Sequence, residues 1–376
     1  MTGQIGESMQ KKQVAVIDIG SSKITAVVAE RGINKTFVIK GRFSYEYDGF
    51  ADGAFFDTEK LKSILFALAS SIKKTTDVDT VYVGVPGEFT QVFVRDSQIS
   101  FAKKKKLQEE DVSALYDASF VLSSTKYTLI SRSAIVYELD DFRRLAYPVG
   151  AVSSILKGKL SFVVCTNYFI EAVKPALDTA GFKNVEFVSS ALAEALYLVE
   201  AETRDRIAII ADIGYISTTF SIVQGDGILY QKSFAYGGGF ITAAITEKFQ
   251  TEFDVAEKIK RKLNLSRIST SSALDLIDGE NGQYYGIEEI KHTVLSSLEV
   301  LCENISDAIE NSGYNIPEYV PLMITGGGIS YVRGAKEHLS NRLGMAVEII
   351  APKVPLMDKP TESTILSLVD LALEQK

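Results

Sequence analysis

Hydrophobic and polar positions near the start of the chain predict two strands joined by a tight polar turn, followed by an amphipathic helix. Residues 14–30 (VAVIDIGSSKITAVVAE) place two β-rich apolar runs around an Asp-Ile-Gly turn and two serines, and a third run starts at Phe37. In residues 58–72, apolar side chains recur at the spacing of one buried helix face. Strands followed by a helix predict an α/β domain.

The same pattern occurs a second time, about half a chain later. Residues 207–225 (IAIIADIGYISTTFSIVQG) again run from an apolar strand through Asp-Ile-Gly and hydroxyl residues into a second strand, with a third run from Ile228. Helical spacing follows at residues 239–249, 254–263 and 286–309. Because each copy has the element order of one domain, the duplication predicts two related α/β domains that face each other.

A segment of different character separates the two copies. Residues 81–101 and 127–141 alternate as strands do, and a helical stretch lies between them at 109–121. This predicts a small α+β insertion of about 80 residues within the first domain. The predicted boundaries are a disordered lead-in at 1–12, the first domain at 13–83 and 164–205, the inserted subdomain at 84–163, and the second domain at 206–376 with 240–315 as its helical subdomain.

The composition fits a folded protein with a sizeable core and excludes several function classes. The 376 residues are 46% hydrophobic and 23% charged, and the net charge of -8 opposes non-specific binding to nucleic acid. Two cysteines and two histidines leave little basis for a disulfide framework, a histidine zinc site or a Ser-His-Asp triad. Neither a membrane-spanning apolar run nor a signal peptide is recognisable, so the expected location is the cytoplasm.

Two glycine clusters precede predicted helices. Gly326 to Gly328 follow the β-rich run PLMIT, and Gly237 to Gly239 follow the second repeat. Glycine lets the backbone approach a ligand closely, and a helix N-terminus offers unpaired N–H groups. A single GGG turn is more often a simple connection, and neither cluster completes a P-loop or a G-x-G-x-x-G pattern.

Two facing Asp-Ile-Gly turns would suit a phosphate tail. A tight turn with a glycine and neighbouring hydroxyls directs N–H and O–H donors to one place, where a phosphate oxygen can accept them. Asp18 and Asp212, at the two strand ends, would then hold Mg²⁺ through its water molecules. One Asp-x-Gly is a generic hairpin turn, but its recurrence in matching context favours the phosphate site.

The joint order of these motifs resembles the actin/Hsp70-type ATPases and, among them, the FtsA family of bacterial cell-division actin homologues. Residues 18–23 and 212–219 are similar to the two phosphate motifs, and residues 324–330 to the adenosine motif. VPGEFTQ, FAYGGGFIT and AEKIK are similar to further segments of that family, and the resemblance covers about residues 13–371. Pilus-assembly actin homologues of the PilM type are the nearest alternative, and a small-molecule kinase of the same fold is a more distant one.

The resemblance implies an α/β, actin-like (ribonuclease H-like) fold of two domains with a nucleotide cleft between them. ATP and Mg²⁺ are the implied ligands. Glu257 and Lys260 would reach the ribose and adenine, and Glu194 is a candidate to polarise a water molecule near the γ-phosphate. The implied nucleotide-binding residues are Asp18, Gly20, Ser21, Ser22, Lys23, Asp212, Gly214, Ser217, Thr218, Thr219, Gly237, Gly238, Glu257, Lys260, Gly326, Gly327 and Gly328.

The second phosphate motif departs from the family pattern. Tyr215 and Ile216 stand where the family has further glycines, at positions where the turn would need positive φ, so an altered loop is expected. The enzyme, if it is one, is therefore expected to be at most a slow ATPase.

The resemblance also implies partners. The insertion would supply one face of a head-to-tail filament, and residues 254–277 and 286–311 would receive the C-terminal tail of FtsZ, with Lys258, Arg261 and Lys262 as rim charges. Residues 363–373 are expected to form a packed terminal helix in place of the family's membrane-targeting helix, so membranes would be reached through partners at the division site. The run Lys103 to Lys106 is interpreted as a solvated loop, with membrane or acidic-partner binding as the less favoured reading.

Overall fold

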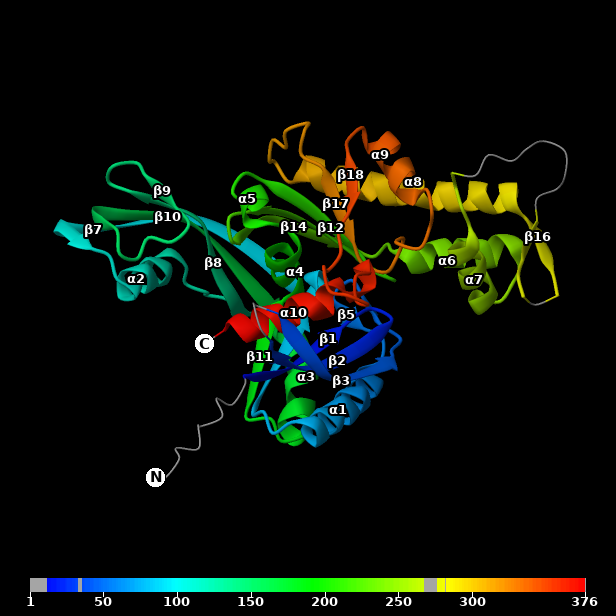
Figure 1. Cartoon of the computed structure of the whole chain (residues 1–376), viewed down its shortest axis with the longest axis horizontal. Coiled ribbons are helices and arrows are strands. Elements are labelled where there is room, and N and C mark those ends of the chain that lie inside the picture. Colours follow the sequence, from blue (N-terminus) through cyan, green and yellow to red (C-terminus); the bar gives the residue numbers. More distant parts are fainter. Residues whose placement is uncertain (1–11, 33–35, 267–275, 281, 376) are drawn as a thin grey trace, which may run out of the picture.

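The computed structural model describes residues 12–32, 36–266, 276–280 and 282–375. The predicted lead-in therefore lies outside the described residues, apart from Lys12. Two five-stranded sheets with helices on their faces form the body, and a long arm extends from it (Figure 1). Among the described residues, the helices are too short or too polar to span a membrane.

The two sheets have the same topology. In the first, three strands pair antiparallel and two more continue in parallel, in the order β3 (Phe37–Glu46), β2 (Lys23–Arg31), β1 (Gln13–Ile19), β6 (Thr80–Val85) and β11 (Asn184–Ser189). The second sheet repeats this order with β14 (Gly227–Phe234), β13 (Thr218–Gln224), β12 (Ala208–Ile213), β17 (Leu322–Thr325) and β18 (Val347–Ile349). The duplication predicted from the sequence is thus present as two equivalent sheets.

The equivalence extends to the register of the strands. Asp18 pairs with Thr25 in the first hairpin, and Asp212 pairs with Thr219 in the second. Each threonine also exchanges a hydrogen bond with a serine on the third strand, 3.0 Å long in both halves. The two aspartates therefore end corresponding strands, which fixes them at matching places in the two halves.

Helices cover the sheets where the hydrophobic spacing predicted them. In the first half, α1 (Thr58–Thr75) begins at Asp57, whose side chain accepts hydrogen bonds from two backbone N–H groups, and it packs beside α3 (Asn167–Thr179). Short strands β4 (Phe50–Ala51) and β5 (Ala54–Phe55) precede α1. In the second half, the helices are α6 (Gly238–Phe249), α7 (Phe253–Lys262), α8 (Ile287–Asn311) and α9 (Ala335–Leu343), with the hairpin of β15 (Leu276–Asp278) and β16 (Tyr284–Gly286) beside α7 and α8.

Two helices lie between the halves. α4 (Ser190–Leu198), followed by the short α5 (Ala201–Arg204), packs against α10 (Ser363–Glu374). α10 buries apolar side chains such as Leu368 against β1 and β2, so it covers the first sheet although the sequence assigned it to the second domain. A 3-10 turn, η2 (Pro360–Glu362), leads into it.

The predicted insertion is the projecting arm in Figure 1. Its sheet has the order β7 (Thr90–Lys106), β10 (Val152–Thr166), β8 (Tyr127–Leu139) and β9 (Arg144–Leu145), and it carries α2 (Glu109–Ser119). The base of the arm is part of the body: the 3-10 turn η1 (Gly87–Phe89) joins it to β6, and Ser161 Oγ donates to the Ile228 carbonyl on β14 at 2.7 Å. Only the outer part of the arm is free of the two main sheets.

Candidate functional site

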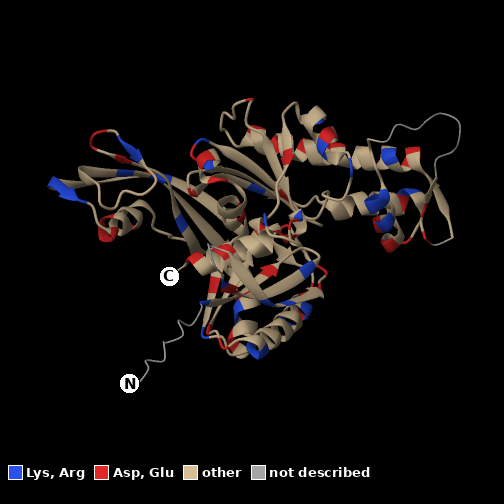
Figure 2. Cartoon of the chain, in the orientation of Figure 1, with Lys and Arg blue, Asp and Glu red and all other residues tan. Residues whose placement is uncertain are grey.

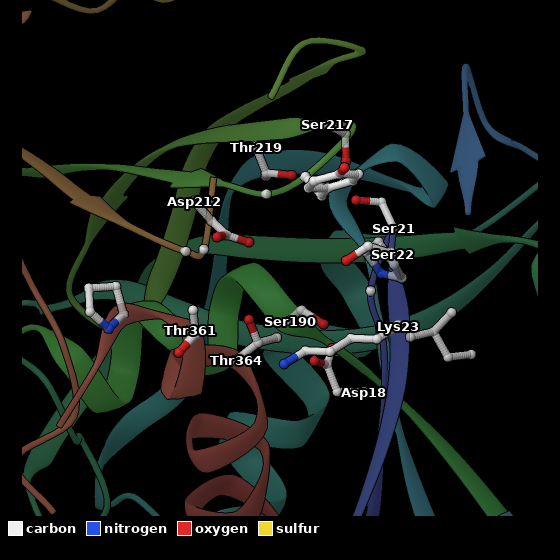
Figure 3. A pocket seen from close by; sticks show the side chains of 18 of the residues that line it. Asp18, Ser21, Ser22, Lys23, Ser190, Asp212, Ser217, Thr219, Thr361 and Thr364 are labelled. Atoms are coloured by element: carbon white, nitrogen blue, oxygen red, sulfur yellow. The ribbon is translucent and has the colours of Figure 1, made fainter. Parts of the chain in front are cut away.

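A cleft with a volume of about 470 Å³ lies between the two halves, where corresponding strands β1 and β12 end. Both Asp-Ile-Gly turns, the start of α4, the glycines after β17 and the segment leading into α10 line this cleft (Figure 3). The sequence elements predicted to face each other therefore do so.

The two turns have the same backbone geometry. Gly20 N donates to the Lys23 carbonyl at 3.0 Å, and Gly214 N donates to the Ser217 carbonyl at 2.9 Å. The turns also touch each other, because Ile216 N donates to Ser21 Oγ at 3.0 Å. This hydrogen bond joins the two turns directly.

Three carboxyl groups gather around the cleft floor. Burial, followed by the charge of Asp212, raises the pKa of Asp18 to about 7, and burial raises the pKa of Asp212 to about 6. Burial and the neighbouring Asp212 also raise the pKa of Glu194, whose Oε1 accepts a hydrogen bond from Thr364 Oγ1 at 2.6 Å. This concentration of acids would be relieved by a bound cation.

The acids fit a hydrated magnesium ion. Within the described ranges, no three His, Cys, Asp or Glu side chains lie close enough together to form a direct metal cage. Mg²⁺ binds through few carboxylates and keeps most of its water, so Asp18 and Asp212 are suited to hold it by hydrogen bonds to that water.

Most of the predicted binding residues line the cleft, and their role in binding stays a prediction. Those that line it are Asp18, Gly20, Ser21, Ser22, Lys23, Glu194, Asp212, Gly214, Ser217, Thr219, Glu257, Gly326 and Gly327. Those that do not are Thr218, Gly237, Gly238, Lys260 and Gly328.

The glycine clusters support the second turn rather than opening toward a ligand. Gly238 N and Gly239 N, at the start of α6, donate to the Gly214 and Tyr215 carbonyls, and Gly328 N donates to the Ile213 carbonyl. The helix N-terminus predicted to offer free N–H groups is therefore engaged within the protein. Gly326, by contrast, does line the cleft. Its φ of +88° favours glycine, and a Cβ atom on this residue would lie only 2.3 Å from Asp212 Oδ1.

Lys260 does not reach the cleft, contrary to the prediction from the family motif. Its side chain is 3% exposed, and Nζ donates to the Gly238 carbonyl and to Thr242 Oγ1, both at 2.9 Å, and pairs with Glu257 at 2.7 Å. Arg261 lines the cleft instead, bonded to Glu257 at 2.8 Å, with its guanidinium 5.0 Å from the Tyr331 ring centre.

The expected strain at Tyr215 and Ile216 is absent. Among the described residues other than glycine, positive φ occurs only at Asp52, Phe142, Gln250, Glu280 and Leu356. The first turn holds two serines at the corresponding positions, so this turn accepts side chains there. The Tyr215 ring packs edge-on against Phe253, with centroids 6.3 Å apart.

Sequence reasoning missed several residues that line the cleft. Ser190 at the start of α4, Thr361 in η2 and Thr364 at the start of α10 bring hydroxyl groups into it (Figure 3). The only local signal was the polar run PTEST before the last apolar helix. Nothing local indicated that this helix crosses to the first sheet.

The family comparison agrees with the motifs. The family model "Cell division protein FtsA" matches residues 209–367. FtsA of Staphylococcus epidermidis is 20% identical, covering 97% of this chain and 80% of that protein, and FtsA of Enterococcus hirae is 21% identical, covering 94% and 81%. FtsA of Escherichia coli is 20% identical over 68% of this chain, and that alignment spans 61% of the relative's length.

Solved structures of low sequence identity share the fold. A PilM-PilN type IV pilus biogenesis complex matches with a TM-score of 0.65 and 18% identity, covering 97% of this chain and all of that one. MreB5 of Spiroplasma citri bound to ADP matches with a TM-score of 0.55 and 13% identity, covering 96% and 95%. The motifs, the family comparison and the fold agree: the chain has an actin-like fold and is similar in sequence to the FtsA family over most of its length.

Proposed function

We propose that this chain is an ATP-binding scaffold of bacterial cell division that self-assembles and recruits the FtsZ ring. The observation that carries the proposal is the pair of equivalent Asp-Ile-Gly turns facing each other across one cleft in a chain that is similar to the FtsA family. The actin-like MreB5 structure with bound ADP supports a nucleotide as the ligand of such a cleft.

The cleft residues divide into two groups by chemistry. At the acidic floor, Asp18 and Asp212 would hold the water shell of Mg²⁺, whose charge would offset that of the phosphates. The hydroxyl and ammonium donors for the phosphates are Ser21, Ser22, Lys23, Ser217 and Thr219. Glu257, Arg261, Tyr331 and the glycines at 326 and 327 would surround the ribose and base.

ATP hydrolysis is proposed to be slow or absent. The reason is the side chains of the second turn, since the backbone strain expected there is absent. Where the first turn has Ser21 and Ser22, the second has Tyr215 and Ile216, so two short hydroxyl side chains are missing on that side. Loss of one electrostatic contact to a transferring phosphoryl group commonly costs about a hundredfold or more in rate.

Calorimetric titration with ATP and ADP, each with Mg²⁺ and with EDTA, tests the nucleotide site. We expect micromolar binding that weakens without Mg²⁺, together with phosphate release slower than about one per minute. Absence of binding at millimolar nucleotide would contradict the proposed site, and brisk phosphate release would contradict the proposed slow turnover.

A PilM-type pilus-assembly role is the second candidate. The observation in its favour is the TM-score of 0.65 to the PilM-PilN complex, although at 18% identity this likeness reflects the fold. The two roles differ in partner, so binding of an FtsZ tail peptide decides between them. A kinase of the same fold would instead transfer phosphate to an added small acceptor in a coupled assay.

The proposed tail-binding surface near α7 has partly neutralised charges. Lys258 and Lys262 both pair with Glu280, at 3.4 and 2.6 Å, while Arg261 turns toward the cleft and leaves the set of rim charges. Part of the predicted region, residues 267–275, lies outside the described residues. An acidic tail would therefore compete with Glu280 for two lysines.

Glu280→Gln is expected to tighten binding of an acidic, partly apolar FtsZ tail peptide by roughly two- to fivefold, because exposed ion pairs contribute up to about 1 kcal/mol. Fluorescence anisotropy at low and high salt measures this, and added salt should weaken binding. Glu59→Gln, which removes the exposed partner of Lys62 on α1 outside this surface, is the control. Equal affinity in wild type and Glu280→Gln would remove this surface from the proposal.

The outer arm is the proposed face for self-association. Phe142 is 76% exposed there, and Figure 2 shows a cluster of Lys and Arg at the end of β7. Phe142→Asp is expected to raise the concentration needed for pelleting with ATP about tenfold or more, as loss of a central apolar anchor does. The control is Tyr319→Asp, which lies outside the arm and is 72% exposed, and it should leave pelleting unchanged. Unchanged sedimentation of Phe142→Asp would exclude the arm tip as an assembly face.

A further inference from the structure

Ser190 is a buried hydroxyl residue without a hydrogen-bond partner at the floor of the cleft. It is the first residue of α4, lines the cleft and is 7% exposed (Figure 3). Within the described part of the chain, its Oγ makes no hydrogen bond. A buried polar group without a partner is unfavourable, so its persistence at a ligand cleft calls for a physical cause.

The second half of the molecule shows what the missing partner is. Asp212 pairs with Thr325 on β17, and Thr325 Oγ1 donates to Ser363 Oγ, at the start of α10, at 2.7 Å. Both residues of that hydrogen bond are buried. The start of α10 therefore carries a hydroxyl that is satisfied by the strand beside its aspartate.

In the first half, the corresponding strand residue has no side chain. Asp18 pairs with Gly84 on β6, and a Cβ atom at Gly84 would lie 2.8 Å from Ser190 Oγ. The same Cβ would lie 2.5 Å from Leu368 Cδ1, so the packing of α10 requires glycine at this position. Close packing of α10 thus removes the partner that Ser190 would otherwise have.

The position of Ser190 relative to the acids suits a ligand oxygen. Gly84, which its Oγ adjoins, is the register partner of Asp18, and Glu194 follows on α4 one helical turn later on the same face. A serine hydroxyl can donate to a phosphate oxygen or accept from a metal-bound water. Both kinds of oxygen belong to one magnesium nucleotide.

We infer that Ser190 is a further ligand-binding residue whose hydroxyl forms a hydrogen bond with an oxygen of the bound magnesium nucleotide beside Asp18. This inference rests on the proposed function, because it requires that a nucleotide occupies the cleft. The inference gives a role to the Ser190 hydroxyl, which has no partner because Gly84 lacks a side chain. The two halves then differ in chemistry although their folds match, since the corresponding hydroxyl of Ser363 is already bonded to Thr325.

The test compares Ser190→Ala with Ser363→Ala, which removes the corresponding hydroxyl of the second half. Ser190→Ala is expected to weaken ATP binding about five- to twentyfold in calorimetric titration and to leave the melting temperature of the ligand-free protein unchanged or higher. Ser363→Ala loses a satisfied buried hydrogen bond, so it should lower that melting temperature and keep ATP affinity within about twofold of wild type.

The titrations are run with ATP and ADP, each with Mg²⁺ and with EDTA. Weakening only with Mg²⁺ supports a contact to metal-bound water, and weakening in both conditions supports a contact to phosphate. Equal affinities of wild type and Ser190→Ala in every condition would overturn the inference and leave the proposed function standing. If wild type binds neither nucleotide, the proposed function fails and the inference with it. If Ser190→Ala does not fold, Ser190→Cys is titrated in its place. Wild-type ATP affinity of Ser190→Cys would then also overturn the inference.

Discussion

Asp18→Asn is expected to make the ligand-free protein more stable at pH 8 and to abolish its stabilisation by Mg²⁺ and ATP. Burial and the neighbouring Asp212 raise the pKa of Asp18 from its ordinary value of 3.8 to about 7, so at pH 8 the folded protein holds a carboxylate in an unfavourable place. Asparagine keeps the shape of the side chain and removes this charge. It also removes the carboxylate that would hold the metal's water.

The pH dependence of stability follows from the raised pKa. Between about pH 4 and 7, the folded protein retains a proton on Asp18 that the unfolded chain releases, so the free energy of unfolding decreases as pH rises through this window. The difference between 3.8 and about 7 corresponds to at most roughly 4 kcal/mol. Magnesium nucleotide binding has the opposite dependence, because the cation must displace that proton, and it should strengthen toward pH 8.

Denaturant unfolding at pH 5 and pH 8, in EDTA and then with Mg²⁺ and ATP, measures both effects. Wild type should lose stability between pH 5 and 8 in EDTA, and Asp18→Asn should lose less. The control is Asp307→Asn, an exposed change on α8 that should preserve the wild-type pattern. A variant that is still stabilised by Mg²⁺ and ATP like wild type would remove Asp18 from the metal site.

The duplicated sheets could be predicted because their signal is local. Each Asp-Ile-Gly turn lies between two apolar strands that pair with each other, so the pattern of about 17 residues determines the hairpin and the position of its aspartate. The same reasoning predicted that Asp18 and Asp212 would face each other. That outcome follows from repeating one topology around a shared cleft.

What the sequence could not indicate depends on contacts between distant segments. The helical spacing of Glu257 and Lys260 places them one turn apart but does not say which of Lys260 and Arg261 turns toward the cleft. Likewise, Thr364 reaches Glu194 because α10 returns to the first sheet, 170 residues away along the chain. The positive φ expected in the second turn failed because a four-residue turn closed from Gly214 N to the Ser217 carbonyl tolerates side chains between them.

Lys260→Met is expected to destabilise the fold strongly, whereas Arg261→Ala is expected to weaken nucleotide binding with little effect on stability. Lys260 is buried and pairs with Glu257, and it also donates to the Gly238 carbonyl at the start of α6. Removing one partner of a buried ion pair costs about 3–5 kcal/mol. Because Arg261 also bonds Glu257, the expected loss is at the lower end, about 3 kcal/mol.

Arg261 differs because its side chain is largely exposed and borders the cleft. Its alanine variant should lose less than about 1 kcal/mol of stability, as exposed ion pairs do, yet weaken ATP binding about tenfold through loss of a guanidinium beside the base. Denaturant unfolding without ligand and titration with ATP at a temperature where both variants are folded measure the two effects separately. The opposite outcome would be a Lys260→Met variant that is as stable as wild type but binds ATP poorly, together with an Arg261→Ala variant that binds ATP normally. In that case Lys260 contacts the nucleotide, and α7 does not direct Arg261 toward the cleft as described.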